Sequence, residues 1–207
     1  MGGDFLRTEE FDTEAVRLAE RFGDRATVRF TGANLIWMDI VRGRWDEGLA
    51  GAEVFIHECE AGSPHTNEGL VRSMRALVRL GRGDPGGALA DLERNVELAR
   101  ENKAPVGIAS ALAVLAEAHV ELGRTETAGA CVEEMIPLVR EHGMTGAITE
   151  IAPHATTLGL RDELAEAVET APGPRAIRSR EVLAFMLDDD LRSAVESPLA
   201  EGQIESA

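Results

Sequence analysis

Basic residues, cysteine and aromatic residues are all scarce in this sequence. Lys and Arg number 21 against 37 Asp and Glu, so the formal net charge at pH 7 is −16. Phosphate backbones are held by Lys and Arg, so we expect no nucleic-acid partner for such an acidic chain. The two cysteines, Cys59 and Cys131, are too few for a disulfide framework, and a cytoplasmic location is expected. No apolar run approaches the roughly 18–20 residues of a membrane span.

The start of the chain lacks targeting features as well. Met1–Asp4 brings neither the basic start nor the apolar stretch of a signal peptide, and no membrane association is expected. The composition, with 44% hydrophobic and 28% charged residues, is that of an ordinary globular chain with a real core. A length of 207 residues fits one large domain or a short repeat array.

An internal repeat is the strongest pattern in the sequence. Gly43, Gly83 and Gly123 fall 40 residues apart twice in succession, and each follows a segment whose apolar residues recur at helical spacing. A weaker copy surrounds Gly159, 36 residues further along. Glycine can adopt the left-handed conformation that closes a helix, and the residues after each glycine favour the start of another helix. Each copy is therefore predicted to be a hairpin of two antiparallel helices.

The apolar periodicity sets the predicted bounds of these hairpins within a single domain over residues 1–207. We expect a lone helix over 12–22, which would be the second half of a truncated repeat. Complete repeats are expected over 26–60, 67–101, 105–142 and 145–170, followed by a weak terminal repeat over 175–196. No period-two stretch is bounded by hairpin turns, so strands are not expected.

The small residues around these turns make the array resemble the tetratricopeptide repeat (TPR). Aligned on the turn glycines, the eighth position of the first helix is Ala76, Ala116 and Ala152, with Ile36 departing, and the packing position of the second helix is Ala88 and Ala128, with Gly48 and Leu164 as variants. The stretch from Gly43 to Leu49, an aromatic and acidic turn that leads into a helix, is the best single match. The resemblance implies an all-α, right-handed superhelix of four to five antiparallel hairpins, a TPR-like solenoid that binds proteins on its concave wall.

The period of 40, longer than the standard repeat, is similar to the helical arrays of bacterial LuxR-type and related multidomain regulators. This resemblance implies a non-catalytic scaffold in a bacterial regulatory or signalling protein. Members that bind acidic chaperone tails use a clamp of Lys, Asn and Arg, whereas the corresponding positions here are Ala33, Ser73 and Ala113. With a charge of −16, a basic or apolar protein or peptide partner is therefore expected.

Six residues on the predicted first helices are candidates for a partner-binding groove: Trp37, Asn34, Met74, Leu77, Glu117 and Glu150. Trp37 leads this set, because aromatic side chains supply much of the binding energy at interfaces. Burial of Trp37 against the next repeat is an equally good interpretation. The sequence does not decide between the two.

Catalytic and metal sites are not expected, and no cofactor is implied. Glu53, His57 and Glu60 share one helix face, but a solvated face is the favoured interpretation over a metal site. No convergent acid, base or nucleophile set appears, so an enzyme is the least favoured of three functions. The others are a protein-interaction module and a sensor that holds a small molecule or peptide. The exposed half repeat also suggests that two copies could pair as a homodimer.

Overall fold

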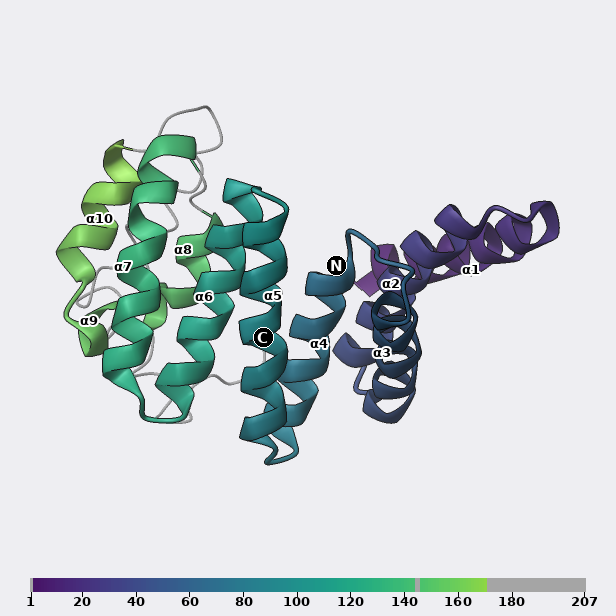
Figure 1. The fold of residues 1–207 in the computed structure, drawn as a ribbon, viewed down its shortest axis with the longest axis horizontal. Helices are drawn as coiled ribbons and strands as arrows, with labels where there is room; N and C mark the ends of the chain where they lie inside the picture. Colours follow the sequence, from purple (N-terminus) through teal and green to yellow (C-terminus); the bar gives the residue numbers. More distant parts are fainter. Residues whose placement is uncertain (1, 144–145, 171–207) are drawn as a thin grey trace, which may run out of the picture. The chain divides into compact units, whose positions relative to one another are not determined.

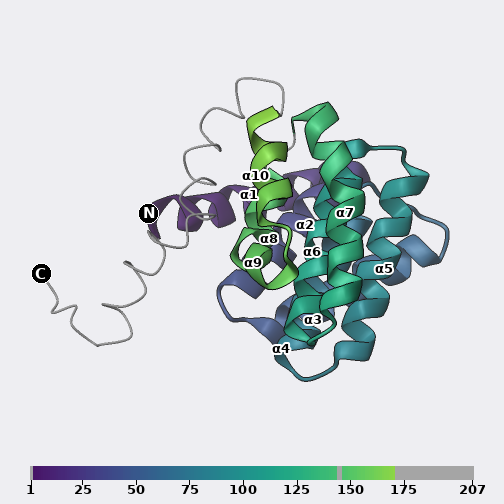
Figure 2. The same ribbon diagram turned by 90° about the vertical axis from the view of Figure 1, so that its left-hand side faces the viewer.

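The structure is a computed structural model that describes residues 2–143 and 146–170 (Figure 1, Figure 2). Those residues form helices and no strand, so the predicted all-α class is confirmed for them. The elements are α1 (Gly2–Phe22), α2 (Arg25–Val41), α3 (Trp45–Glu60), α4 (Glu68–Gly81), α5 (Pro85–Glu101), α6 (Pro105–Glu121), α7 (Thr125–His142), α8 (Gly146–Ile151), the 3₁₀ turn η1 (Ala152–His154), α9 (Ala155–Leu158) and α10 (Arg161–Thr170). None of these helices is both long and apolar enough to cross a membrane.

The described residues fall into two compact units, which are divided between Leu98 and Ala99. In the first unit α1 packs against α2, α2 against α3, and α4 against both α2 and α3. Hydrogen bonds between side chains join α4 to α5. In the second unit α6 pairs with α7, α8 lies against α6, and α10 lies against α7 (Figure 1). The single repeat domain over 1–207 stays a prediction.

The evenly spaced glycines close their helices in the same way. Gly43, Gly83 and Gly123 have φ angles of 77, 77 and 70°, a left-handed conformation that costs other residues energy. At each turn the next residue's backbone N–H donates to the carbonyl oxygen five positions back, which satisfies one of the helix's last acceptors. These bonds join Arg44 to Asp39 at 2.8 Å, Asp84 to Arg79 at 2.9 Å and Arg124 to His119 at 2.8 Å, and Leu160 to Ala155 at 3.0 Å after Gly159.

Small residues beside these turns let the two helices of each hairpin approach closely. Ala88 and Ala128, five positions after their turn glycines, are fully buried. A Cβ atom on Gly48, the equivalent position in the first hairpin, would lie only 2.6 Å from Ile40 Cγ1. Larger side chains fill the space between hairpins; in the first unit the core comprises Ala33, Ile36, Ala52, Phe55, Ile56, Cys59, Val71 and Met74, with Ile40 packed against it.

Two elements differ from the sequence prediction. The first helix starts at Gly2 rather than at residue 12, because no glycine or proline interrupts the stretch from Asp4 to Phe11 even though its apolar periodicity is weak. The first helix of the repeat expected over 145–170 is divided into α8, η1 and α9 around Pro153, whose ring has no N–H to donate within a helix. The weak repeat expected over 175–196 lies outside the described residues.

Candidate functional site

A cavity of about 420 Å³ lies where α1, α2 and α4 meet in the first unit. We call it the Trp37 cavity, and its lining residues are Asp12 from α1, Asn34, Trp37 and Met38 from α2, and Leu70 and Met74 from α4. The α2 residues lie at helical spacings of three and four, so they share one face, and the α4 residues share a face in the same way. The cavity is therefore built mainly from the first helices of two successive hairpins.

Trp37 keeps a large part of its side chain in solvent. Its exposed fraction is 39%, whereas Met74, which lines the same cavity, is 4% exposed. An indole that is half-buried beside apolar neighbours presents both a face for stacking and an edge for polar contact. Trp37 is therefore partly buried, in one cavity lining with Leu70 and Met74 of the next hairpin, and both interpretations left open by the sequence stay predictions.

Asp12 is the one acidic residue among the described residues that line this cavity. The Asn34 side chain hydrogen-bonds the Asp12 carboxyl. The second carboxyl oxygen, Oδ2, is shielded from solvent and has no hydrogen-bond partner in the described part of the chain. Burial raises the pKa of the Asp12 carboxyl, and the hydrogen bond from Asn34 opposes this rise. An ionised Asp12 therefore stands in surroundings that supply little to stabilise its charge.

The structure brings together three of the six groove candidates. Asn34, Trp37 and Met74 line the Trp37 cavity. Leu77 does not line it, but it continues the face of α4 that carries Leu70 and Met74, and it is 51% exposed. The partner-binding role of all four residues stays a prediction.

Glu117 and Glu150, the remaining two candidates, belong to the second unit. They lie on α6 and α8, which pack against each other. Burial raises the pKa of Glu117, and the negative charges of Glu150 and Glu121 raise it further. Like charges held near one another disfavour ionisation, so this pair would gain from a nearby cation.

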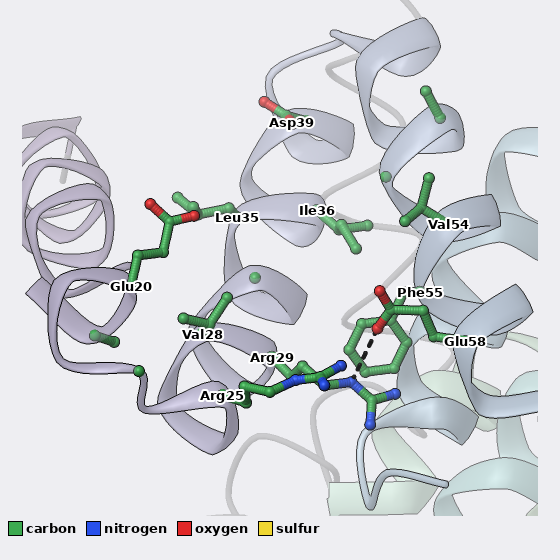
Figure 3. Close-up of a pocket in the computed structure, with 15 residues that line it drawn as sticks. Glu20, Arg25, Val28, Arg29, Leu35, Ile36, Asp39, Val54, Phe55 and Glu58 are labelled. Atoms are coloured by element: carbon green, nitrogen blue, oxygen red, sulfur yellow. Dashed lines mark ion pairs between the residues drawn. The ribbon is translucent and has the colours of Figure 1, made fainter. Parts of the chain in front are cut away.

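A larger cavity of about 750 Å³ lies between α1, α2 and α3 in the same first unit, and the sequence analysis missed it (Figure 3). Its lining residues are Ala19, Glu20, Gly23, Arg25, Val28, Arg29, Gly32, Leu35, Ile36, Asp39, Ala50, Gly51, Val54, Phe55 and Glu58. Gly32 is a helix-interior glycine whose Cβ would have no neighbour within 4 Å, so it leaves space beside α2. Gly32 and Gly51, two glycines inside predicted helices, are the feature of the sequence that could have indicated this space.

Arg29 forms one side of this larger cavity. Its Nε lies 3.4 Å from Glu58 Oε2 (Figure 3). Its Nη2 donates to Cys59 Sγ at 3.1 Å. Its guanidinium carbon also lies 5.1 Å from the centre of the Phe55 ring, a cation–π geometry. These contacts fix Arg29 as part of the wall.

A buried ionic network links α4 to α5, and the sequence analysis missed it too. Asp91 is 2% exposed and accepts hydrogen bonds from Arg72 at 3.3 Å, Arg75 at 2.6 and 2.8 Å, and Arg79 at 2.8 Å. Arg72 also pairs with Glu60 at 2.8 Å. Glu60, one of the three residues on the helix face considered for a metal site, is therefore already in an ion pair. Among the described residues, no group of three or more His, Cys, Asp or Glu is arranged to hold a metal ion.

The fold is similar to solved TPR-like repeat proteins. BtubC (BKLC) from P. vanneervenii has a TM-score of 0.60 at 12% sequence identity, covering 98% of this chain and 94% of that protein. TPR-like repeats attributed to a kinesin light chain of Podosopora anserina have a TM-score of 0.55 at 17% identity, covering 84% and 96%. A single-substitution variant of the same repeats gives 0.56 at 16% identity, covering 84% and 86%.

The chain is a TPR-like helical repeat array. No family model matches it, and no curated protein does either. The TPR-like resemblance carried by the turn glycines and small packing residues is therefore confirmed at the level of the fold. Identities below 20% carry the architecture and no partner.

Proposed function

We propose that this protein is a non-catalytic scaffold that binds a protein or peptide partner on the α2 and α4 faces around the Trp37 cavity. The observation that carries the proposal is the half-exposed Trp37 at the rim of an apolar cavity. Such cavities accept an anchoring side chain, and aromatic residues beside them dominate binding energies. The exposed Leu77 on the same α4 face extends the contact surface beyond the cavity.

The partner in this proposal is basic or apolar. The net charge of −16 attracts basic segments and repels acidic ones, and it speeds the encounter of basic segments with the surface. We also propose that the scaffold serves as a cytoplasmic module of a larger bacterial regulator, and the resemblance of its lengthened repeats to such arrays supports this role.

Selection from a displayed library of random peptides tests the scaffold proposal and needs no identified partner. Peptides enriched on the wild-type protein should bind Trp37→Ala at least about tenfold more weakly, the loss typical of an interface anchor. Trp45→Ala is the matched control, since Trp45 is 38% exposed but lies outside the cavity lining. Thermal melts would verify that both variants fold. If no sequence is enriched, or both variants bind as wild type does, the proposal is wrong.

A second candidate function, a sensor for an apolar small molecule, is favoured by the larger cavity. Its volume of about 750 Å³ falls within the range of small-molecule sites, and apolar side chains of α2 and α3 line much of it. The dye Nile red should fluoresce on binding to the wild-type protein. Because the space beside Gly32 is open, Gly32→Leu should fill the cavity and abolish the signal, whereas Gly129→Leu on α7 should not. Equal fluorescence from all three proteins would remove this candidate.

A further inference from the structure

Two carboxyl groups of the first unit, those of Asp91 and Asp12, receive very different sets of hydrogen bonds from their neighbours. Asp91 receives hydrogen bonds from three arginine side chains. Asp12 receives one from the neutral amide of Asn34, and its Oδ2 has no hydrogen-bond partner among the described residues. An ionised carboxylate can accept hydrogen bonds at both oxygens, and leaving one shielded and unsatisfied is costly. The Asp12 carboxylate therefore has no cationic partner among the described residues of its own unit.

The residues around Asp12 indicate which kind of ligand group could pair with its carboxyl. None of the described residues that line the Trp37 cavity is basic. With the carboxyl in this lining are Trp37, Met38, Leu70 and Met74, which offer one aromatic surface and several flexible apolar side chains. A volume of about 420 Å³ is far above the ~30 Å³ share of one water molecule, so the space can hold a side chain.

We propose that the Trp37 cavity receives the arginine side chain of a peptide partner, with Asp12 as its counter-charge. The apolar residues would contact the arginine methylene groups, and the indole of Trp37 would stack on the guanidinium plane. The guanidinium would then supply the counter-charge that the Asp12 carboxyl lacks and would donate hydrogen bonds to it from the cavity. The inference rests on the proposed scaffold function and specifies the residue that the scaffold recognises.

Arginine suits this cavity better than the alternatives. Its guanidinium is flat, more weakly hydrated than an ammonium and able to donate two parallel hydrogen bonds to one carboxylate. A purely apolar ligand would leave the Asp12 carboxyl as unsatisfied as it is in the free protein. A lysine would pair with Asp12 as a point charge and would gain less from stacking on Trp37.

Two pools of fluorescein-labelled random heptapeptides would test the proposal. One pool carries a central arginine, and the other carries citrulline, its neutral and nearly isosteric analogue. By fluorescence polarisation, wild-type protein should bind the arginine pool at least about tenfold more tightly, the difference expected for a shielded charge pair. Asp12→Asn should bind the two pools equally. Glu14→Gln, which removes an exposed charge from the same helix, should keep the preference for arginine.

The possible results separate this inference from the scaffold proposal. Equal binding of both pools by the wild type, with loss of both in Trp37→Ala, would overturn the arginine site and leave the scaffold standing. Failure of the wild type to bind either pool would overturn both proposals. If Asp12→Asn still prefers the arginine pool, other acidic residues are responsible for the preference. That result would overturn the role of Asp12. Asp12→Ser is the second variant, to be used if the melting temperature of Asp12→Asn falls.

Discussion

Removal of the Asp91 charge should destabilise the first unit strongly. In Asp91→Asn the side-chain shape is kept, but three guanidinium groups lose their shared counter-charge. The side chains of Arg72, Arg75 and Arg79 are 7%, 12% and 27% exposed, so water reaches them only in part. Their mutual repulsion would then act in surroundings that screen charge weakly.

The size of the effect follows from how much of the network survives. Removing one partner of a buried ion pair typically costs about 3–5 kcal/mol, because a charge stays buried without compensation. Arg72 would keep Glu68 at 2.8 Å, and Arg79 is the most exposed of the three. These features place the expected loss at the lower end, about 3 kcal/mol, a large share of the roughly 5–15 kcal/mol of an ordinary domain.

Tryptophan fluorescence during urea unfolding is the assay that isolates this loss. Both tryptophans, Trp37 and Trp45, lie in the unit Met1–Leu98, so their signal reports that unit, whereas circular dichroism reports the helices of both units. The matched control is Glu97→Gln, since Glu97 forms an exposed pair with Arg94 and should cost less than about 0.5 kcal/mol. A loss below about 1 kcal/mol in Asp91→Asn would show that the network does not hold the hairpin together.

Two further predictions concern packing and pH. Gly48→Ala should lower the free energy of unfolding by about 1–3 kcal/mol, because the new Cβ would lie 2.6 Å from Ile40 Cγ1. Gly129→Ala, whose new Cβ would meet nothing within 4 Å, should raise it by about 0.5–1 kcal/mol. Urea unfolding measures both changes. Glu117→Gln should raise the melting temperature at pH 7, since burial and the charge of Glu150 raise the pKa of Glu117 and make its ionised form costly in the fold. That gain should shrink as the pH falls toward and below 4.5, the ordinary pKa of the group, where wild-type Glu117 becomes protonated in both states; a constant difference would contradict the assignment.

The fold could be predicted from the sequence because its determinants are local. A turn glycine and the hydrogen bonds that follow it involve residues within one or two helical turns, so a single copy of the pattern is informative and three copies are decisive. The helices after Gly43, Gly83 and Gly123 begin two residues after that glycine. The division of the helix at Pro153 was not predicted, although a proline inside a helix removes one of its hydrogen bonds.

The functional surface was predictable only in part, because cavities depend on how three helices meet. The spacing of Asn34 and Trp37 on one helix face could be read from the sequence, and so could the position of Met74 on the next first helix. Asp12 could not be assigned, since it lies at the start of the helix expected over 12–22 and nothing local links it to Asn34. Asp91 was missed for the same reason: its three arginine partners are 12 to 19 residues away along the chain.

The first hairpin departs from the repeat pattern at both of its small positions, and its helix α2 borders both cavities. Ile36 stands where the later hairpins have alanine, and its extra volume is accommodated by Gly51, whose Cβ would lie 2.9 Å from Ile36 Cγ1. Ile40 of α2 packs against Gly48 of α3 in the same way, one helical turn further along α2. Large side chains on α2 thus face glycines on α3, which maintains the packing between the two helices. Ile36 and Gly51 both line the larger cavity, and Trp37, the next residue along α2, lines the Trp37 cavity. The first hairpin therefore keeps close packing between its two helices although both positions depart from the repeat pattern, because each larger side chain on α2 meets a glycine on α3.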